Sequence, residues 1–130
     1  MPGINLLAVV VAAVAAFIVS TVWYIIFAKE LAKVSPNFAD MKAAPNWKKI
    51  AVIVQSFVIA FVLAYVIGLT GTTGWIGAVS LAIWLWVGFS AMQWVGSMLW
   101  ENVPPMLAAI HGGDWLVKLI VIAIIVGVWR

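Results

Sequence analysis

The chain has no cysteine among its 130 residues and carries very little charge. Without cysteine it can form no disulfide bond, no thiolate metal site and no cysteine nucleophile. Charged residues make up only 8% of the sequence, against 67% hydrophobic residues. A soluble domain with so few charges would lack a polar surface, so the composition indicates a single integral membrane domain over residues 1–130.

The single histidine and the few acidic residues match no familiar catalytic or metal-binding pattern. The sequence holds no glycine-rich phosphate loop, no nucleophile elbow and no zinc-binding helix motif. We therefore expect no enzyme, no catalytic residues, no metal site and no cofactor.

What the chain does have is a series of long apolar runs separated by short polar segments. Each run is long enough, at ~1.5 Å per residue, to approach or exceed the ~30 Å thickness of the hydrocarbon core. The sequence therefore predicts an all-α bundle of four transmembrane helices over 4–28, 50–69, 75–100 and 105–129. The first run follows no basic residue and is too long for the core of a cleaved signal peptide, so we expect it to be retained.

Most of the basic residues lie in the segment between the first two predicted helices. Five of the seven stand within 29–49, namely Lys29, Lys33, Lys42, Lys48 and Lys49. Because short basic loops remain on the cytoplasmic side of a membrane, we expect this loop inside and both termini outside. Orientation alone explains these charges, so we expect no nucleic-acid partner.

Small residues recur every fourth position on the first two predicted helices. Such stripes allow close approach of helix backbones in lipid, where no hydrophobic force drives helices together. We expect them to pack the two helices on each other or on a second copy of the chain. The stripes consist of Ala8, Ala12, Ala16 and Ser20, and of Ser56, Ala60, Ala64 and Gly68.

Polar and ionisable residues gather on the facing ends of the third and fourth predicted helices. Their spacing of three or four residues puts each set on one helical face. Since charges in hydrocarbon need partners, we expect these residues to form a polar site between the two helices, with Asp114 paired to Lys118. The predicted site consists of Gln93, Ser97, Glu101, His111, Asp114 and Lys118.

The adjacent glycines Gly112 and Gly113 leave two conformations open for the last helix. It can continue through them with a kink or local loosening, which we favour. Alternatively, Asp114 can cap a separate helix beginning at Trp115. A broken helix would expose backbone groups that bind ions.

These features favour a small transporter or channel-like protein for an ion or polar solute, lodged in the lipid bilayer. A four-helix protomer has little interior of its own, so we expect a homo-oligomer, with a dimer favoured. The alternative is an accessory subunit whose tryptophan-rich third helix docks on a larger membrane complex. A polar network of this kind can also serve only to fix the packing of the helices.

Three groups of residues resemble a known family of small bacterial membrane proteins, domain of unknown function 1761. The first is Trp23-Tyr24 followed by Phe27-x-Lys29, and the second is Trp86-Val87-Gly88-Phe89 before Glu101. The third runs from Pro105 through Ile110-His111-x-Gly113 to Leu116-Val117. The chain departs from the family pattern at Ala28, His111 and Asp114. The resemblance implies four spans and a multi-pass bundle, and it implies no activity. We expect the protein in the inner (plasma) membrane of a bacterium or archaeon.

Overall fold

A computed structural model describes residues 3–35 and 45–129 of the chain. Every regular element in these two ranges is helical. The elements are α1 (Leu6–Ile26), α2 (Ala28–Val34), α4 (Asn46–Leu69), α5 (Gly74–Leu85), the π-helix η2 (Trp86–Ala91), α6 (Met92–Trp100) and α7 (Pro105–Val128).

The predicted fold class is confirmed, because four helical spans are long and apolar enough to cross a membrane. The third span is built from α5, η2 and α6, which follow one another without a break. The chain is therefore a multi-pass integral membrane protein. The largest difference from the predicted bounds is at the second span, where α4 begins at Asn46 and takes in Lys48 and Lys49.

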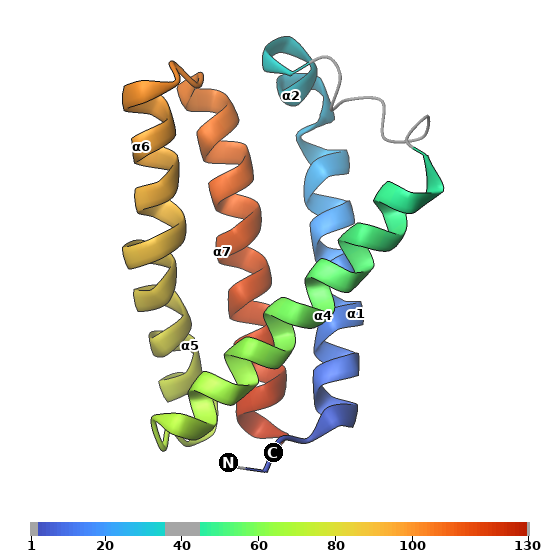
Figure 1. Cartoon of the computed structure of the whole chain (residues 1–130), viewed down its shortest axis with the longest axis vertical. Helices are drawn as coiled ribbons and strands as arrows, with labels where there is room; N and C mark the ends of the chain where they lie inside the picture. The colour runs from blue at the N-terminus through green and yellow to red at the C-terminus, as the bar shows by residue number, and fades with distance from the viewer. Residues whose placement is uncertain (1–2, 36–44, 130) are drawn as a thin grey trace.

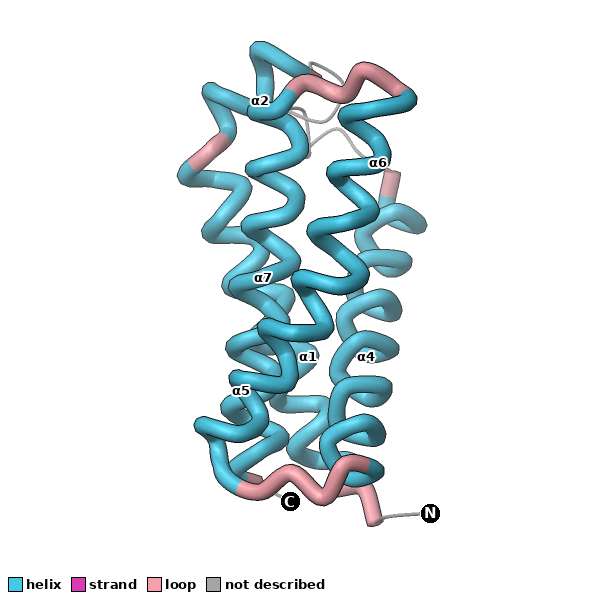
Figure 2. The backbone as a smooth tube through the Cα atoms, turned by 90° about the vertical axis from the view of Figure 1, so that its left-hand side faces the viewer, coloured by secondary structure: helices cyan, strands magenta, loops and turns pink. Residues whose placement is uncertain are grey.

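The helix α7 lies at the centre of the molecule and packs against every other described helix. Its closest neighbours are α1 on one side and α5 on the other, and α4 crosses α1 diagonally (Figure 1). The described ends of the chain meet at one end of the bundle (Figure 2). The short helix α2 and the turn between α6 and α7 lie at the opposite end, which we call the lysine-rich end because Lys29 and Lys33 belong to it.

Most residues of the small-residue stripes are buried within the single chain, whereas Ser20, Ala64 and Gly68 are half-buried. On α1, Ala8, Ala12 and Ala16 are each at most 1% exposed, and on α4 Ser56 and Ala60 are also buried. Because α1 packs against both α4 and α7, the stripe of α1 allows these three helices to approach closely. Of the two partners expected for the stripes, the structure shows the one within the chain.

The π-helix η2 interrupts the third span and changes which residues face α7. Twelve α-helical steps of about 100° from Ala82 would leave Trp94 about a third of a turn away from it. A π-helix accommodates one extra residue in its turn. The angle around the helix axis between Ala82 and Trp94 is therefore smaller by about one 100° step. Ala82 and Trp94 therefore share the face toward α7, and Ala82 is fully buried there.

Candidate functional site

A buried ion pair on α7 forms the centre of the candidate site. The Lys118 Nζ atom lies 3.3 Å from Asp114 Oδ2, one helical turn away. Asp114 is 3% exposed and Lys118 is 6% exposed. Asp114 lies nine residues from the start of α7, or about 14 Å along the helix axis, so both charges are well inside the span. The ion pair expected from the spacing of these residues is present.

Side chains of the neighbouring helix α1, which forms the first span, lie against this ion pair and provide hydrogen-bond donors to it. The Ser20 hydroxyl donates a hydrogen bond to Asp114 Oδ1, and the Tyr24 hydroxyl lies 3.5 Å from Asp114 Oδ2. Ser20 and Tyr24 are one turn apart on α1, so both face α7 from the same side. The carboxylate of Asp114 is thereby supplied with donors from two helices, which is what a buried charge requires.

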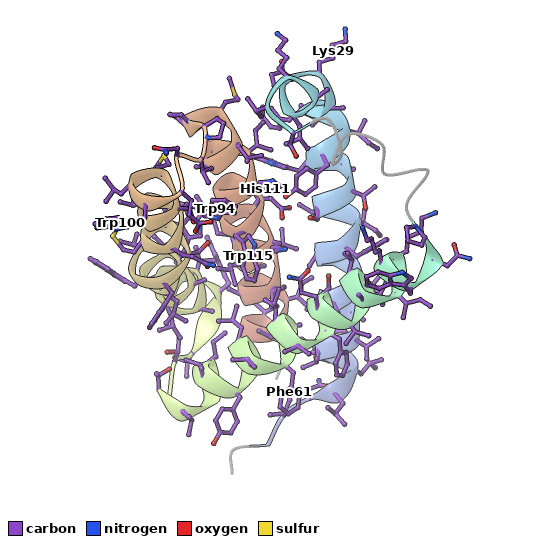
Figure 3. The ribbon with its side chains drawn as sticks, turned by 45° about the horizontal axis from the view of Figure 1, so that its top comes forward. Lys29, Phe61, Trp94, Trp100, His111 and Trp115 are labelled. Atoms are coloured by element: carbon purple, nitrogen blue, oxygen red, sulfur yellow. The ribbon has the colours of Figure 1, made fainter. Side chains whose placement is uncertain are left out.

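His111 joins the cluster one turn closer to the lysine-rich end. Its Nδ1 atom lies 2.6 Å from the Tyr24 hydroxyl oxygen, and its ring stacks on Trp94 of α6 with centroids 5.3 Å apart. Figure 3 shows His111 and Trp94 in the space between α6, α7 and α1. The four residues His111, Tyr24, Asp114 and Lys118 therefore form one continuous polar series along α7.

The helix α7 continues without a break through Gly112 and Gly113, as we favoured. The missing side chain of Gly113 instead makes room for the indole ring of Trp23, and a second indole, that of Trp86, lies against Gly112. Trp23 of α1 donates its Nε1–H to the Ile110 carbonyl oxygen at 2.8 Å, and Trp86 of η2 donates to the Gly112 carbonyl oxygen at 2.8 Å. A Cβ atom at Gly113 would lie only 2.5 Å from the Trp23 ring. Gly113 thus allows α1 to approach the cluster closely.

The far end of the cluster is closed by aromatic and aliphatic side chains. The Lys118 ammonium lies 4.3 Å from the ring centroid of Trp115, a cation–π contact that supplements its ion pair. Beyond Lys118, the buried residues of α7 are Ile122, Ala123, Val126 and Gly127, none of which offers a polar side chain. The cluster therefore occupies the half of the span nearer the lysine-rich end.

A sequence model of the family described as "Protein of unknown function (DUF1761)" matches residues 7–127. The chain belongs to this family. No curated protein and no solved structure matches it. Membership of DUF1761 confirms the resemblance seen in the sequence but assigns no activity, so the function of this DUF1761 protein has to be argued from its geometry.

The six predicted site residues of this DUF1761 protein do not all come together. His111, Asp114 and Lys118 form the cluster, whereas Gln93 and Glu101 are exposed and Ser97 is half-buried. The hydrogen bonds to Asp114 come from α1. The cluster therefore lies chiefly between the first and fourth spans rather than between the third and fourth, and the third span contributes Trp94 and Trp86.

Sequence reasoning missed Ser20, Tyr24 and Trp23 as members of the cluster. The spacing of small residues places Ser20 in the packing stripe of the first span, and Trp23-Tyr24 ends that span where interfacial aromatic residues are expected. The available signal was the spacing of Ser20 and Tyr24, one turn apart. This spacing matches that of the polar residues on α7 when the two helices run antiparallel.

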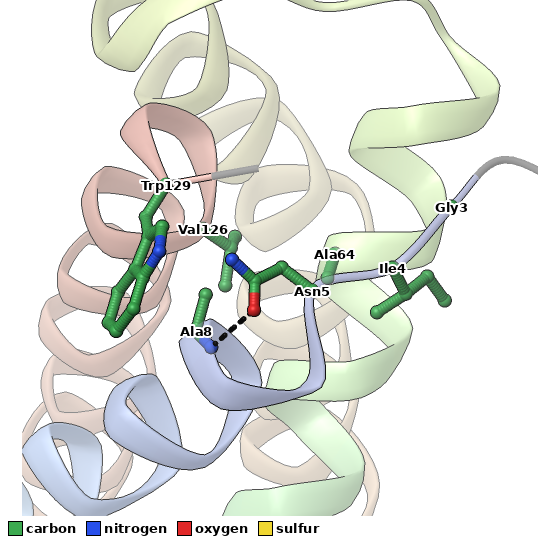
Figure 4. Close-up of a pocket in the computed structure, with 7 residues that line it drawn as sticks. All are labelled: Gly3, Ile4, Asn5, Ala8, Ala64, Val126 and Trp129. Carbon is green, nitrogen blue, oxygen red and sulfur yellow. Dashed lines mark hydrogen bonds between the residues drawn. The ribbon is translucent and has the colours of Figure 1, made fainter.

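Two hollows in the described part of this DUF1761 protein lie away from the cluster. A hollow near the termini, about 10 Å³ in volume, has room for roughly one water molecule. It adjoins Asn5, whose Oδ1 atom caps α1 by accepting from the Ala8 N–H at 3.2 Å (Figure 4). A second hollow of about 220 Å³ is lined by apolar side chains of α1 and α4, among them Phe17 and Phe57.

The described residues of this DUF1761 protein include no group of three or more histidine or acidic side chains placed to hold a metal ion. The cluster brings together one carboxylate, one ammonium group, an imidazole and two hydroxyl groups. Such a set can bind or pass on a proton or hold a small polar ligand by hydrogen bonds.

Proposed function

We propose that this protein moves a small ion or polar solute across the membrane as a homo-oligomer, with the Asp114–Lys118 pair in its path. The observation that carries the proposal is the burial of this acid–base pair within a membrane-spanning helix, with partners from a second helix. Ionisable residues at this depth cost about 2.5–3.5 kcal/mol each to insert, and in membrane proteins they mark transport paths and relays.

The position of the cluster supports entry of the solute from the lysine-rich end. His111 stands six residues from the start of α7, about 9 Å along the helix, so it is the member of the cluster nearest that end. The apolar residues beyond Lys118 separate the cluster from the other side. Transport therefore requires a change of shape in the protomer, or a path that neighbouring protomers complete. We further propose that the protein works in the plasma membrane of a bacterium or archaeon, with its termini outside.

The test is a flux assay on purified protein in liposomes, with proton, potassium, sodium and chloride gradients applied in turn. We expect flux of one of these ions for the unmodified protein and its loss, at least tenfold, in Asp114→Asn and Lys118→Met. Ser20→Ala should lower the flux because it removes a donor to Asp114.

The matched control for the flux assay is Thr21→Val on the same helix. The Thr21 hydroxyl bonds only to the Phe17 carbonyl oxygen one turn back on α1, and the residue is exposed. This variant should keep full flux. Unchanged flux in both Asp114→Asn and Lys118→Met, or no flux above empty liposomes for the unmodified protein, would retire the proposal.

A second function, that of an accessory subunit, is favoured by the surface of the third span. Trp84 is 71% exposed and Trp100 is 87% exposed, so these two indole rings are available for docking on another membrane protein. Purification in a mild detergent separates the two functions. A foreign membrane protein recovered in fixed proportion favours docking, and recovery of this chain alone favours transport.

A further inference from the structure

The outer face of the third span carries a set of four residues that no other part of the chain covers. Steps of four, three and four residues put them on one side of the helix. Phe89 and Trp100, at the two ends of the set, are 73% and 87% exposed. Gln93 is also exposed, and a Cβ atom added at Gly96 would meet nothing within 4 Å. We call this set the Gln93 face: Phe89, Gln93, Gly96 and Trp100.

The amide of Gln93 needs a hydrogen-bonding partner that lipid cannot provide. It lies seven residues before the end of α6, about 10 Å along the helix from Trp100. A side-chain amide has two N–H donors and one oxygen acceptor, and leaving them unsatisfied in hydrocarbon costs free energy. Trp94, the next residue, already faces His111, so the helix cannot rotate to bury Gln93 without losing that stacking.

We propose that the Gln93 face is the interface between two copies of this chain, related by a two-fold axis that passes beside Gln93. A glutamine amide is self-complementary, because it both donates and accepts. A two-fold axis brings the same residue of each copy together, so each Gln93 can satisfy the other. Gly96, one turn further on, lets the two helix backbones approach closely enough for this contact.

The rest of the lipid-facing surface is less suited to this role. Most of the small-residue stripes of α1 and α4 is already buried inside the chain, at Ala8, Ala12, Ala16, Ser56 and Ala60, which leaves little of them for a second copy. Gln55 of α4 is a second exposed amide, but Val58 stands where the third span has Gly96. A branched side chain at that position holds a neighbouring helix further away.

This interface rests on the proposed function, because it specifies how the proposed homo-oligomer assembles. It can nevertheless be tested without measuring transport. Since the chain has no cysteine, a single introduced cysteine reports one position without background. The reporter is Gly96→Cys, oxidised in native membranes and followed by non-reducing electrophoresis. The two-fold arrangement brings the two introduced thiols within disulfide distance, so a covalent dimer should form. Val58→Cys, on the exposed side of α4, should stay monomeric.

The decisive variants add one further change to the Gly96→Cys reporter. Gln93→Leu should lower the cross-linked fraction about sevenfold, the effect of losing the two interhelical hydrogen bonds between the paired amides. Gln55→Leu makes the same change at the other exposed amide and should leave cross-linking unaltered. A second disruptive variant, Gly96→Leu, should abolish the dimer seen in mild detergent, with the thermal unfolding of the protomer unchanged.

Three results would overturn the proposal. One is a Gly96→Cys chain that stays monomeric or cross-links to a different protein. Another is cross-linking of Val58→Cys in its place. The third is an equal loss with Gln55→Leu and Gln93→Leu, which would indicate a head-to-tail contact between different faces. Because Asp114→Asn should keep the dimer while abolishing flux, failure of the transport proposal and failure of the interface give different results.

Discussion

Asp114 shows how a charged residue is held inside this bundle. Its carboxylate accepts from Ser20, lies within reach of Tyr24 and is paired with Lys118, so its oxygens meet donors from two helices. Lys118 in turn rests against the ring of Trp115. Removing one partner of a buried ion pair typically costs about 3–5 kcal/mol, because the other charge stays buried alone. The transport variants therefore need a check of folding beside the flux assay.

Gly113 should be among the least replaceable residues of α7. In Gly113→Ala the new Cβ atom would lie 2.5 Å from the Trp23 ring, which cannot move away without losing its hydrogen bond to Ile110. Overpacking of this kind costs about 1–3 kcal/mol. We expect a loss of that size in the free energy of unfolding, measured by denaturant titration in detergent micelles.

The matched control for Gly113 is Gly88→Ala, where an added Cβ atom meets nothing within 4 Å. Alanine favours a helix over glycine by up to about 1 kcal/mol, so this variant should unfold no more easily than the original chain. Equal destabilisation by the two substitutions would mean that Trp23 does not constrain Gly113.

Some residues of the cluster could be predicted from the sequence, and others could not. The pairing of Asp114 with Lys118 depends only on their separation along one helix, which the sequence contains. The contribution of Ser20 and Tyr24 depends on how far α1 slides along α7. That register is set by Gly113, Trp23 and the buried alanines together, so no single spacing predicts it.

Among the elements, η2 aligns the residues of α5 and α6 that face α7. By accommodating one extra residue, it puts Trp94 against His111 while α5 keeps Ala78 close to Gly127 of α7. Trp86, at its first position, donates to the Gly112 carbonyl oxygen. No hydrophobic period in the sequence distinguishes this segment from an ordinary α-helix, so the third span was predicted as one regular helix.

Deleting Gly88 should convert η2 to an α-helix at little cost. Gly88 is exposed and its Cβ position is open, and eleven regular steps from Ala82 still bring Trp94 to within about 20° of the same face. We expect the free energy of unfolding to change by about 1 kcal/mol or less.

The control deletion removes Ser80, another exposed residue of the same span. It turns the start of α5 by about 100° and takes Ala78 away from Gly127, so it should destabilise the protein by several kcal/mol. If the Gly88 deletion proves as damaging as the Ser80 deletion, the extra residue in η2 has a role beyond aligning the two faces.

For the whole molecule, the four spans and the multi-pass architecture could be predicted because they follow from hydropathy and length alone. The packing order could not. The sequence left two partners open for the small-residue stripes, and the diagonal crossing of α4 over α1, together with the packing of α7 on α1, buries most of them within one chain (Figure 1). The predicted loop also contains α2, whose Leu31 is buried, while residues 36–44 of that loop lie outside the described ranges.

The remaining prediction concerns the direction in which the bundle crosses the membrane. The helix α2, with Lys29 and Lys33, lies at one end of the bundle and the described ends of the chain lie at the other. The helix α4 begins, with Lys48 and Lys49, in the half of the bundle nearer α2. The positive-inside rule then puts the lysine-rich end in the cytoplasm. Because the chain lacks cysteine, Ala32→Cys and Thr73→Cys report the two ends separately, and both positions are exposed.

A membrane-impermeant maleimide applied to intact cells should label Thr73→Cys and leave Ala32→Cys unlabelled until the membrane is opened. The physical reason is that each lysine near an anionic cytoplasmic surface is favoured by about 1 kcal/mol, and no comparable group of charges opposes this at the other end. Labelling of Ala32→Cys on intact cells would show that the bundle crosses the membrane in the opposite direction. The polar cluster would then open outward, and solute would reach His111 from outside the cell.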